Sequence, residues 1–485
     1  MVFSSTIFLF LFLPITLLVY LVVGRRIRNL VLLAASLAFY AWGENIYVLL
    51  MLCSILINYV FGLLIDRAQK GGSSGKGALV CAVAANLGLL CFFKYANFIV
   101  ANLNAVLIKL QLDPVTLQEV HLPIGISFFT FQALSYVIDL YRRESQVQKN
   151  PINIALYISL FPQLIAGPIV RYHDISTQIT LRMTSFEDFS YGIRRFIIGL
   201  GKKVLLANVL GRTADYIFSL PPERIPATLA WLGAVSYTLQ IYYDFSGYSD
   251  MAIGLGRMFG FRFLENFNYP YISSSIREFW RRWHISLSSW FKDYLYIPLG
   301  GSRGGAARTY MNLVIVFFLC GLWHGASWTF VGWGLYHGCF LVLERIRPGR
   351  FLLNFMPTAI QHLYVMLVVI VGWVFFRADT FGYALAYLGA MVNFSTPALY
   401  NSQIFLNLNT EFYVVLVIAV VGSAPVFQQL EKWTEEWSPT RPSVSRTLVG
   451  GVISVTSVCF FGFVFLYAIA SIMGGAYNPF LYFRF

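Results

Sequence analysis

The residue best suited to chemistry is His324, which directly follows an apolar run. Gly321 and Gly325 flank it and remove side-chain bulk, so a ligand or another backbone can approach closely. Trp328, four residues later, would share its helical face. A neutral imidazole there can accept a proton from a hydroxyl, and general-base catalysis of this kind contributes about 10²–10⁴-fold in rate. The alternative is a histidine that only hydrogen-bonds a neighbouring helix.

A further histidine, His337, follows 13 residues later. On one continuous helix of about 100° per residue, its imidazole would lie roughly 220° from that of His324. The two rings would then not share a face. Either the helix breaks at Gly332 or Gly334, or His337 is structural, and we favour the structural interpretation.

The second candidate for chemistry is His284, in a segment rich in aromatic and basic residues. Read as one helix, the segment has an apolar stripe that includes the histidine: Trp280, His284, Leu287 and Phe291. Three arginines gather near its start: Arg277, Arg281 and Arg282. One interpretation is an amphipathic helix at a membrane interface. The other points His284 into a cavity and places the arginines beside an anionic donor, such as a phosphate-bearing thioester carrier.

Two carboxylates, Asp244 and Asp250, lie in apolar sequence. Carboxylates at such depth usually pair with a cation or orient a histidine. The candidate cations are Arg171, Arg194 and Arg195. Alternatively, the aspartates cap helices at a broken span. The sequence contains no HExxH spacing and no Walker loop, so we expect no metal and no tightly bound cofactor.

The composition indicates the elements that must position these residues. Of 485 residues, 58% are hydrophobic and 12% are charged, whereas soluble domains are about 25% charged. This favours a polytopic helical membrane protein and excludes a transmembrane β-barrel and a disordered chain. The net charge is +13, and the basic residues lie between the apolar spans, as at Arg25–Arg28. It therefore fits cytoplasmic loops and anionic lipid headgroups rather than nucleic acid.

The apolar pattern predicts an all-α fold of about 11 transmembrane or re-entrant helices in one membrane domain, residues 1–485. Within it we expect N-terminal helices over 1–121, a catalytic core over 122–345 and C-terminal helices over 346–485. A span over 78–93 is followed by an interfacial helix over 97–110. Hydrophobic runs between 151 and 310, such as 227–250, are broken by Gly, Pro or charges and suggest re-entrant segments around a cavity. Residues 378–411 and 431–446 are expected to form loops.

Four segments resemble the membrane-bound O-acyltransferase family, and most of all its bacterial alginate O-acetyltransferase branch. They are Phe161–Ile169, Asp244–Asp250, Arg281–Trp290 and Trp323–Trp328. The resemblance is strong over 122–344. It implies transfer of an acyl group from a thioester to a hydroxyl, through a central tunnel that opens to both membrane faces. The family's catalytic histidine corresponds to His324, and its second position corresponds to His284.

The resemblance also implies an acetyl donor, acetyl-CoA or another acetyl thioester, on the cytoplasmic side of a bacterial inner membrane. It implies an external SGNH-type partner and a polysaccharide acceptor. We expect His324 to act as the base and His284 to bind or polarise the acyl carbonyl. The residues expected to line the tunnel or contact substrate are Trp280, Trp323, Trp328, Arg281, Arg282, Asp244 and Asp250.

Other functions remain open at this stage. D-alanyl transfer to teichoic acid and peptidoglycan O-acetylation would use the same fold. A solute transporter belongs to a different class, and Asp244 and Asp250 in apolar sequence would permit it. Transporters often contain matched inverted halves, and this sequence has one irregular region without a matching second half.

Overall fold

The computed structural model describes residues 1–395, 408–426, 429, 443–475 and 477, and within them it contains helices and no strand. The predicted connection 378–411 and loop 431–446 lie partly outside these residues. The loop predicted over 378–411 is wrong in its described part, because residues Phe381–Val392 form helix α18. By length and composition, five described helical stretches could cross a membrane: Arg28–Lys70, Lys76–Lys109, Ala306–His324, Thr358–Arg377 and Val455–Met473. Shorter apolar helices accompany them. The all-helical membrane fold is therefore confirmed, whereas the number of about 11 segments is not.

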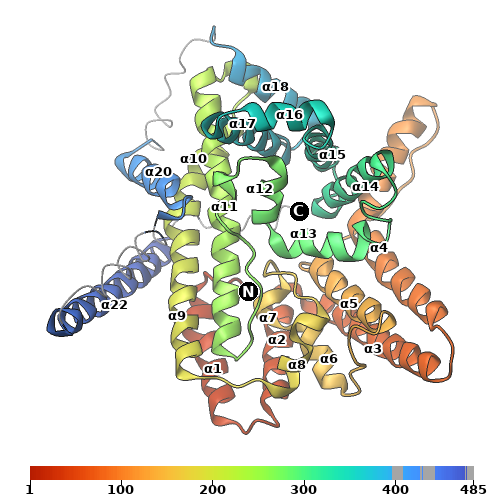
Figure 1. Cartoon of the computed structure of the whole chain (residues 1–485). Coiled ribbons are helices and arrows are strands. Elements are labelled where there is room, and N and C mark those ends of the chain that lie inside the picture. The colour runs from red at the N-terminus through yellow and green to blue at the C-terminus, as the bar shows by residue number, and fades with distance from the viewer. Residues whose placement is uncertain (396–407, 427–428, 430–442, 476, 478–485) are drawn as a thin grey trace.

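The N-terminal helices form one side of the molecule (Figure 1). They are α1 (Leu13–Val22), α2 (Arg28–Glu44), α3 (Val48–Lys70) and α4 (Lys76–Lys109). The predicted division of residues 78–110 into a span and a separate interfacial helix is wrong, because α4 is continuous. No Gly or Pro interrupts the sequence between Lys94 and Lys109, so nothing in the backbone ends the helix there.

The central region contains both short and long helices. They are α5 (Ile126–Tyr141), α6 (Pro151–Ser159), α7 (Phe161–Leu164), α8 (Tyr172–Leu181), α9 (Phe186–Gly201), α10 (Asn208–Phe218), α11 (Ala227–Met258), α12 (Ile276–Arg282) and α13 (Ile285–Phe291). The short helices α6 and α7 are buried by the surrounding protein, as irregular backbone in a membrane requires.

The predicted break within 227–250 is wrong, because α11 runs unbroken through it. Its glycines serve packing against α9 instead. A Cβ at Gly192 of α9 would lie 2.6 Å from the carbonyl oxygen of Gly254, and one at Gly199 would collide with that of Gly247. Small residues let two membrane helices approach this closely. The pair α9 and α11 runs through the middle of the molecule (Figure 1).

The C-terminal helices complete the fold. They are α14 (Ala306–His324), α15 (Trp328–Leu343), α16 (Arg347–Phe355), α17 (Thr358–Arg377), α18 (Phe381–Val392), α20 (Thr410–Gly422) and α22 (Ser443–Met473). Helices α14 to α18 lie in the upper part of Figure 1, and α20 and α22 lie on the left, beside α10 and α9. Helix α14 packs against α15, and α15 packs against α17, while α22 packs against α9.

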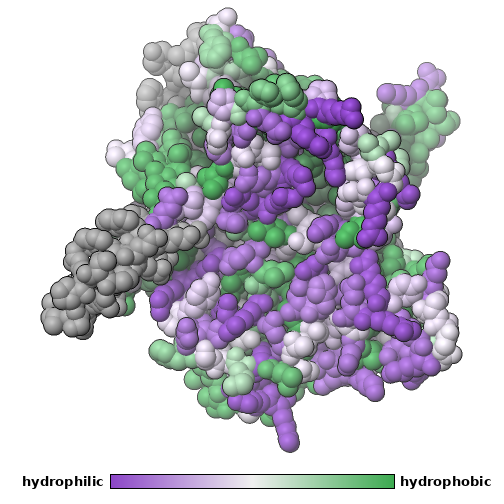
Figure 2. Space-filling model, in the orientation of Figure 1, coloured by the Kyte–Doolittle hydropathy of each residue, from purple (hydrophilic) through white to green (hydrophobic). Residues whose placement is uncertain are grey.

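The surface has the polarity expected of a membrane protein. Large apolar side chains are exposed along the outer helices, as at Leu18 in α1, Leu56 in α3 and Leu466 in α22. Figure 2 shows a face on which hydrophilic residues gather, including over α12, while hydrophobic residues lie around its edges. An apolar rim of this kind suits contact with lipid.

Candidate functional site

His324 is the last residue of α14, and a short turn connects it to α15, where Ser327 caps the helix by accepting from the Thr329 N–H. The two helices pack with their backbones in contact. A Cβ at Gly321 would collide with the carbonyl oxygen of Phe330. The expected role of Gly321 in a close approach is therefore confirmed, and its neighbour is the backbone of α15.

The His324 ring is 7% exposed and stands among three aromatic rings. Its centroid lies 5.0 Å from those of Trp323 and Trp333 and 5.2 Å from that of Phe376, in edge-to-face arrangements. Within the described part of the chain, no group hydrogen-bonds its imidazole. The described structure therefore does not show the alternative role of His324, which was a hydrogen bond to a neighbouring helix. Both ring nitrogens remain available to a ligand.

Trp328 does not share a helical face with His324, so that prediction is wrong. Because α14 ends at His324 and α15 begins at Trp328, the spacing of one helical turn does not apply. The indole is 58% exposed, and its N–H donates to Asn102 of α4 over 2.8 Å. Trp328 therefore contacts α4 rather than sharing a helical face with His324.

The predicted continuous helix through His284 is wrong. His284 has left-handed backbone angles, φ 44° and ψ 55°, and separates α12 from α13. Such backbone angles are rare for a residue with a side chain, and they persist only where the surrounding structure holds them. The stripe predicted for an interface is buried instead, as at Trp280, Leu287 and Phe291. The interfacial interpretation of this segment is therefore wrong as well.

The side chain of Asn266 holds His284 in place. Its Oδ1 accepts hydrogen bonds from the Ser286 N–H (3.2 Å) and hydroxyl (2.9 Å) and lies 3.1 Å from Nδ1 of His284. A backbone N–H can only donate, so this atom is the amide oxygen, and Nδ1 must carry a hydrogen. Nε2 of His284 is buried without a partner in the described structure. In the neutral ring it therefore offers a lone pair.

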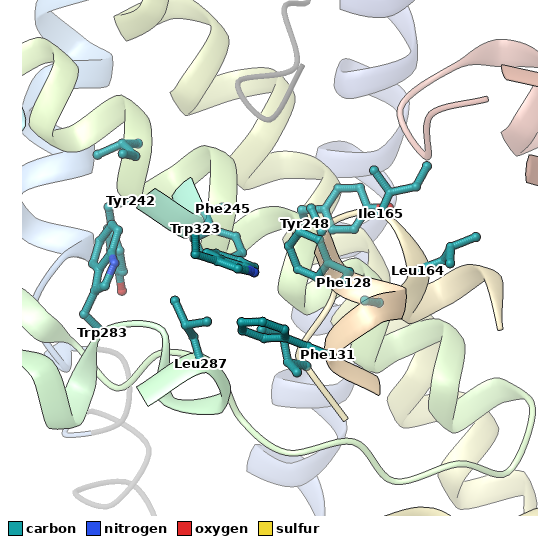
Figure 3. Close-up of a cluster of buried hydrophobic side chains, with 14 of the residues drawn as sticks. Phe128, Phe131, Leu164, Ile165, Tyr242, Phe245, Tyr248, Trp283, Leu287 and Trp323 are labelled. Atoms are coloured by element: carbon teal, nitrogen blue, oxygen red, sulfur yellow. The ribbon is translucent and has the colours of Figure 1, made fainter. Parts of the chain in front are cut away.

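Trp323 connects the two candidate histidines. Its ring centroid lies 5.0 Å from that of His324 and 6.2 Å from that of His284. Figure 3 shows Trp323 at the centre of a buried cluster, near Phe131, Leu287 and Phe245. Phe245 in turn packs edge-on against His284, with centroids 4.6 Å apart. The structure thus brings together two histidines that are 40 positions apart in the sequence.

Asp244 and Asp250 lie inside α11 and form ion pairs with cations of neighbouring elements, rather than capping a helix. Asp250 binds Arg195 (2.7 Å) and Lys202 (2.7 Å), and Asp244 binds Lys203 (2.5 Å). Arg195 was among the candidate cations, whereas both lysines were missed. Of the other candidates, Arg171 binds Asp174 and Asp293, and Arg194 donates to Ser190. The two aspartates connect α11 to α9 and to the π-helical segment Lys202–Ala207.

The arginines of α12 lie toward the surface. Arg282 pairs with Glu278 (2.8 Å), and Arg281 is exposed and forms no ion pair within the described residues. Glu344, which follows the last residue of α15, accepts from the N–H groups of Ile276 and Arg277, over 2.6 and 3.0 Å. A carboxylate at a helix N-terminus is favourable, so this contact fixes the start of α12.

A polar network that the sequence did not reveal lies near α8. The buried carboxylate of Asp139 accepts from the Tyr294 hydroxyl (2.6 Å) and lies 2.9 Å from Nδ1 of His173. That hydrogen bond raises the pKa of His173 above its ordinary value. Asp139, Glu144 and His173 are close enough to hold a metal ion. However, Nε2 of His173 lies 3.3 Å from Asp174, so two carboxylates already engage the imidazole.

Residues 84–383 match the model of the membrane-bound O-acyltransferase family. The chain is 43% identical to the probable alginate O-acetylase AlgI of Pseudomonas putida, over 100% of both chains. It is 47% identical to the protein of the same name from Pseudomonas aeruginosa, over 82% of this chain and 76% of the relative. It is 37% identical to the peptidoglycan O-acetyltransferase of Helicobacter pylori, over 82% and 81%. The matched region includes His284 and His324.

Proposed function

This chain belongs to the membrane-bound O-acyltransferase family, and on that premise we propose that it moves an acetyl group from a cytoplasmic thioester across the membrane toward hydroxyls of a secreted, alginate-like polysaccharide. The observation that carries the proposal is the pair of buried histidines in contact with Trp323. The names of the three relatives support an acetyl group and a polymeric acceptor.

His324 acts as the general base in this proposal. Its imidazole takes the proton of the attacking hydroxyl while the hydroxyl oxygen bonds to the thioester carbonyl carbon. The carbon–sulfur bond of the tetrahedral intermediate then breaks, and the departing sulfur receives the proton from His324. No described protein group hydrogen-bonds the imidazole. Both proton transfers can therefore occur without breaking a hydrogen bond within the protein.

The contact with Asn266 favours a particular role for His284. With a hydrogen on Nδ1, the neutral ring presents only an acceptor at Nε2. An acceptor can orient the attacking hydroxyl, whereas polarising the acyl carbonyl would require a donor and hence a buried imidazolium. We therefore favour hydroxyl orientation over the carbonyl polarisation expected from the sequence.

Aromatic side chains would keep water from the reacting thioester. Trp323, Trp333 and Trp280 are buried around the two histidines and His337. Excluding water limits hydrolysis of a reactive acyl donor. Arg281, exposed beside this cluster on α12, would meet the phosphate groups of acetyl-CoA or of another acetyl thioester carrier.

The remaining parts of the proposal concern location and partners. The multi-pass fold would lie in a bacterial cytoplasmic membrane, in contact with lipid, and an external SGNH-type protein would complete delivery to the polymer. The family resemblance supports both statements, and the exposed apolar rim supports the membrane location.

The proposal is tested with the purified chain in liposomes, supplied separately with acetyl-CoA and with a D-alanyl carrier thioester. Release of free thiol from acetyl-CoA is the expected result, with acetyl transfer to a polymannuronate oligosaccharide when the external partner is added. Turnover of the D-alanyl carrier alone would replace acetyl transfer with D-alanyl transfer. Solute uptake without thioester cleavage would overturn the enzymatic function in favour of transport.

A further inference from the structure

Two adjacent residues of α4 bind the end of α14. The final carbonyl groups of any helix lack partners within that helix. Here the Tyr95 hydroxyl donates to the carbonyl oxygen of Leu322 over 2.8 Å. The Lys94 ammonium donates to that of Trp323, and over 3.5 Å to that of His324. Helix α4 thus supplies donors to the last three residues of α14.

Lys94 is unusual among the basic residues of this chain. It is buried within a helix that could span a membrane, where a charged side chain is costly. No carboxylate in the described structure pairs with it. Its partners are the two carbonyl groups, the Ser127 hydroxyl at 3.2 Å, and the Trp323 ring, whose centroid lies 5.7 Å away. A cation suits the negative end of a helix, so α14 provides the compensation that a carboxylate would otherwise give.

This contact matters because no group among the described residues hydrogen-bonds the imidazole of His324. The ring packs against the rings of Trp323, Trp333 and Phe376. The direction of the ring therefore depends on the backbone at the end of α14 and on the packing of Trp323. Lys94 binds both of these, the backbone through the carbonyl groups and Trp323 through its ring face.

We propose that Lys94 is a positioning residue, which fixes the peptide groups of Trp323 and His324 and so aims the His324 imidazole at the reacting hydroxyl. Tyr95 supports it one residue further from the end of α14. This inference rests on the catalytic role of His324 in the proposed function. A small displacement of a catalytic group can lower the rate by about 10²-fold.

The test is a double-mutant cycle of Lys94→Met and His324→Ala in liposomes, with thiol release from acetyl-CoA as the readout, or from the D-alanyl carrier if the parent uses only that donor. Lys109→Met is the matched control, because it makes the same change at the exposed end of the same helix. We expect Lys94→Met to lower kcat by about 10²-fold, with KM for the donor changed by less than about twofold. Lys109→Met should match the parent.

The cycle separates positioning from general structure. If Lys94 acts through His324, Lys94→Met should change the residual rate of His324→Ala by less than about twofold, because the two losses are not additive. An equal loss in both backgrounds, or a kcat within about threefold of the parent, would overturn the inference while leaving the role of His324 intact. A fully active His324→Ala would overturn both proposals. If Lys94→Met does not fold, Lys94→Gln, which keeps an N–H donor, replaces it in the same cycle.

Discussion

Asn266 sets the hydrogen position on His284, because its amide oxygen lies 3.1 Å from Nδ1 and is fixed by the N–H of Ser286. We predict that Asn266→Ala lowers acyl-transfer kcat by about 10–10²-fold, since Nε2 would no longer be held as the acceptor. It should also cost about 1–3 kcal/mol of stability through the unsatisfied Ser286 groups. Asn266→Asp, which retains an acceptor, should be less impaired. Equal kcat values for parent and Asn266→Ala, measured by thiol release, would exclude this role.

The ion pair of Lys203 and Asp244 predicts a large effect on stability. Both side chains are almost fully buried, and they connect the π-helical segment to α11. Removing one member of a buried pair leaves an uncompensated charge and costs about 3–5 kcal/mol. We therefore expect Lys203→Met to lower the unfolding temperature in detergent markedly.

The matched control for that experiment is the exposed pair of Lys70 and Asp66, one helical turn apart on α3. Lys70→Met should change stability by less than about 1 kcal/mol, because solvent screens surface pairs. Similar losses of stability for Lys203→Met and Lys70→Met would show that the buried pair stabilises the fold no more than the surface pair.

His173 predicts how stability depends on pH. Its pKa is raised in the folded chain, mainly by the hydrogen bond to Asp139 and despite partial burial. Stability from this contact is therefore fully present below the unfolded pKa of about 6.5, and it is lost as pH rises through the higher folded pKa. We expect the unfolding temperature of the parent to fall over that interval. His173→Gln should lack this component, and an identical pH dependence in parent and variant would contradict the assignment.

The sequence indicated the two candidate histidines more clearly than the residues that hold them in place. His324 and His284 were recognisable because an imidazole in apolar sequence is costly and the surrounding motifs resemble a family. The end of α14 was also readable, since Ser327 is a favourable cap before Trp328. Because this cap begins a new helix, the helical face predicted for His324 and Trp328 does not form.

The residues that hold the two histidines in place were harder to predict, because they act through contacts between distant parts of the sequence. Asn266 lies in an irregular segment with no periodic pattern, yet it meets His284 across 18 positions. The left-handed backbone of His284 has no sequence signal, since no glycine marks it. Lys94 meets Trp323 across 229 positions, and its sequence neighbours indicate only a polar interruption of an apolar helix.

The central claim is that the imidazole of His324 performs the proton transfer. The most direct measurement is acyl transfer by His324→Ala in liposomes, with the amount of folded protein in the membrane matched to the parent. The account predicts a loss of about 10²–10⁴-fold, and a severe but smaller loss for His284→Ala. Acetylation at the parental rate by folded His324→Ala would contradict the account.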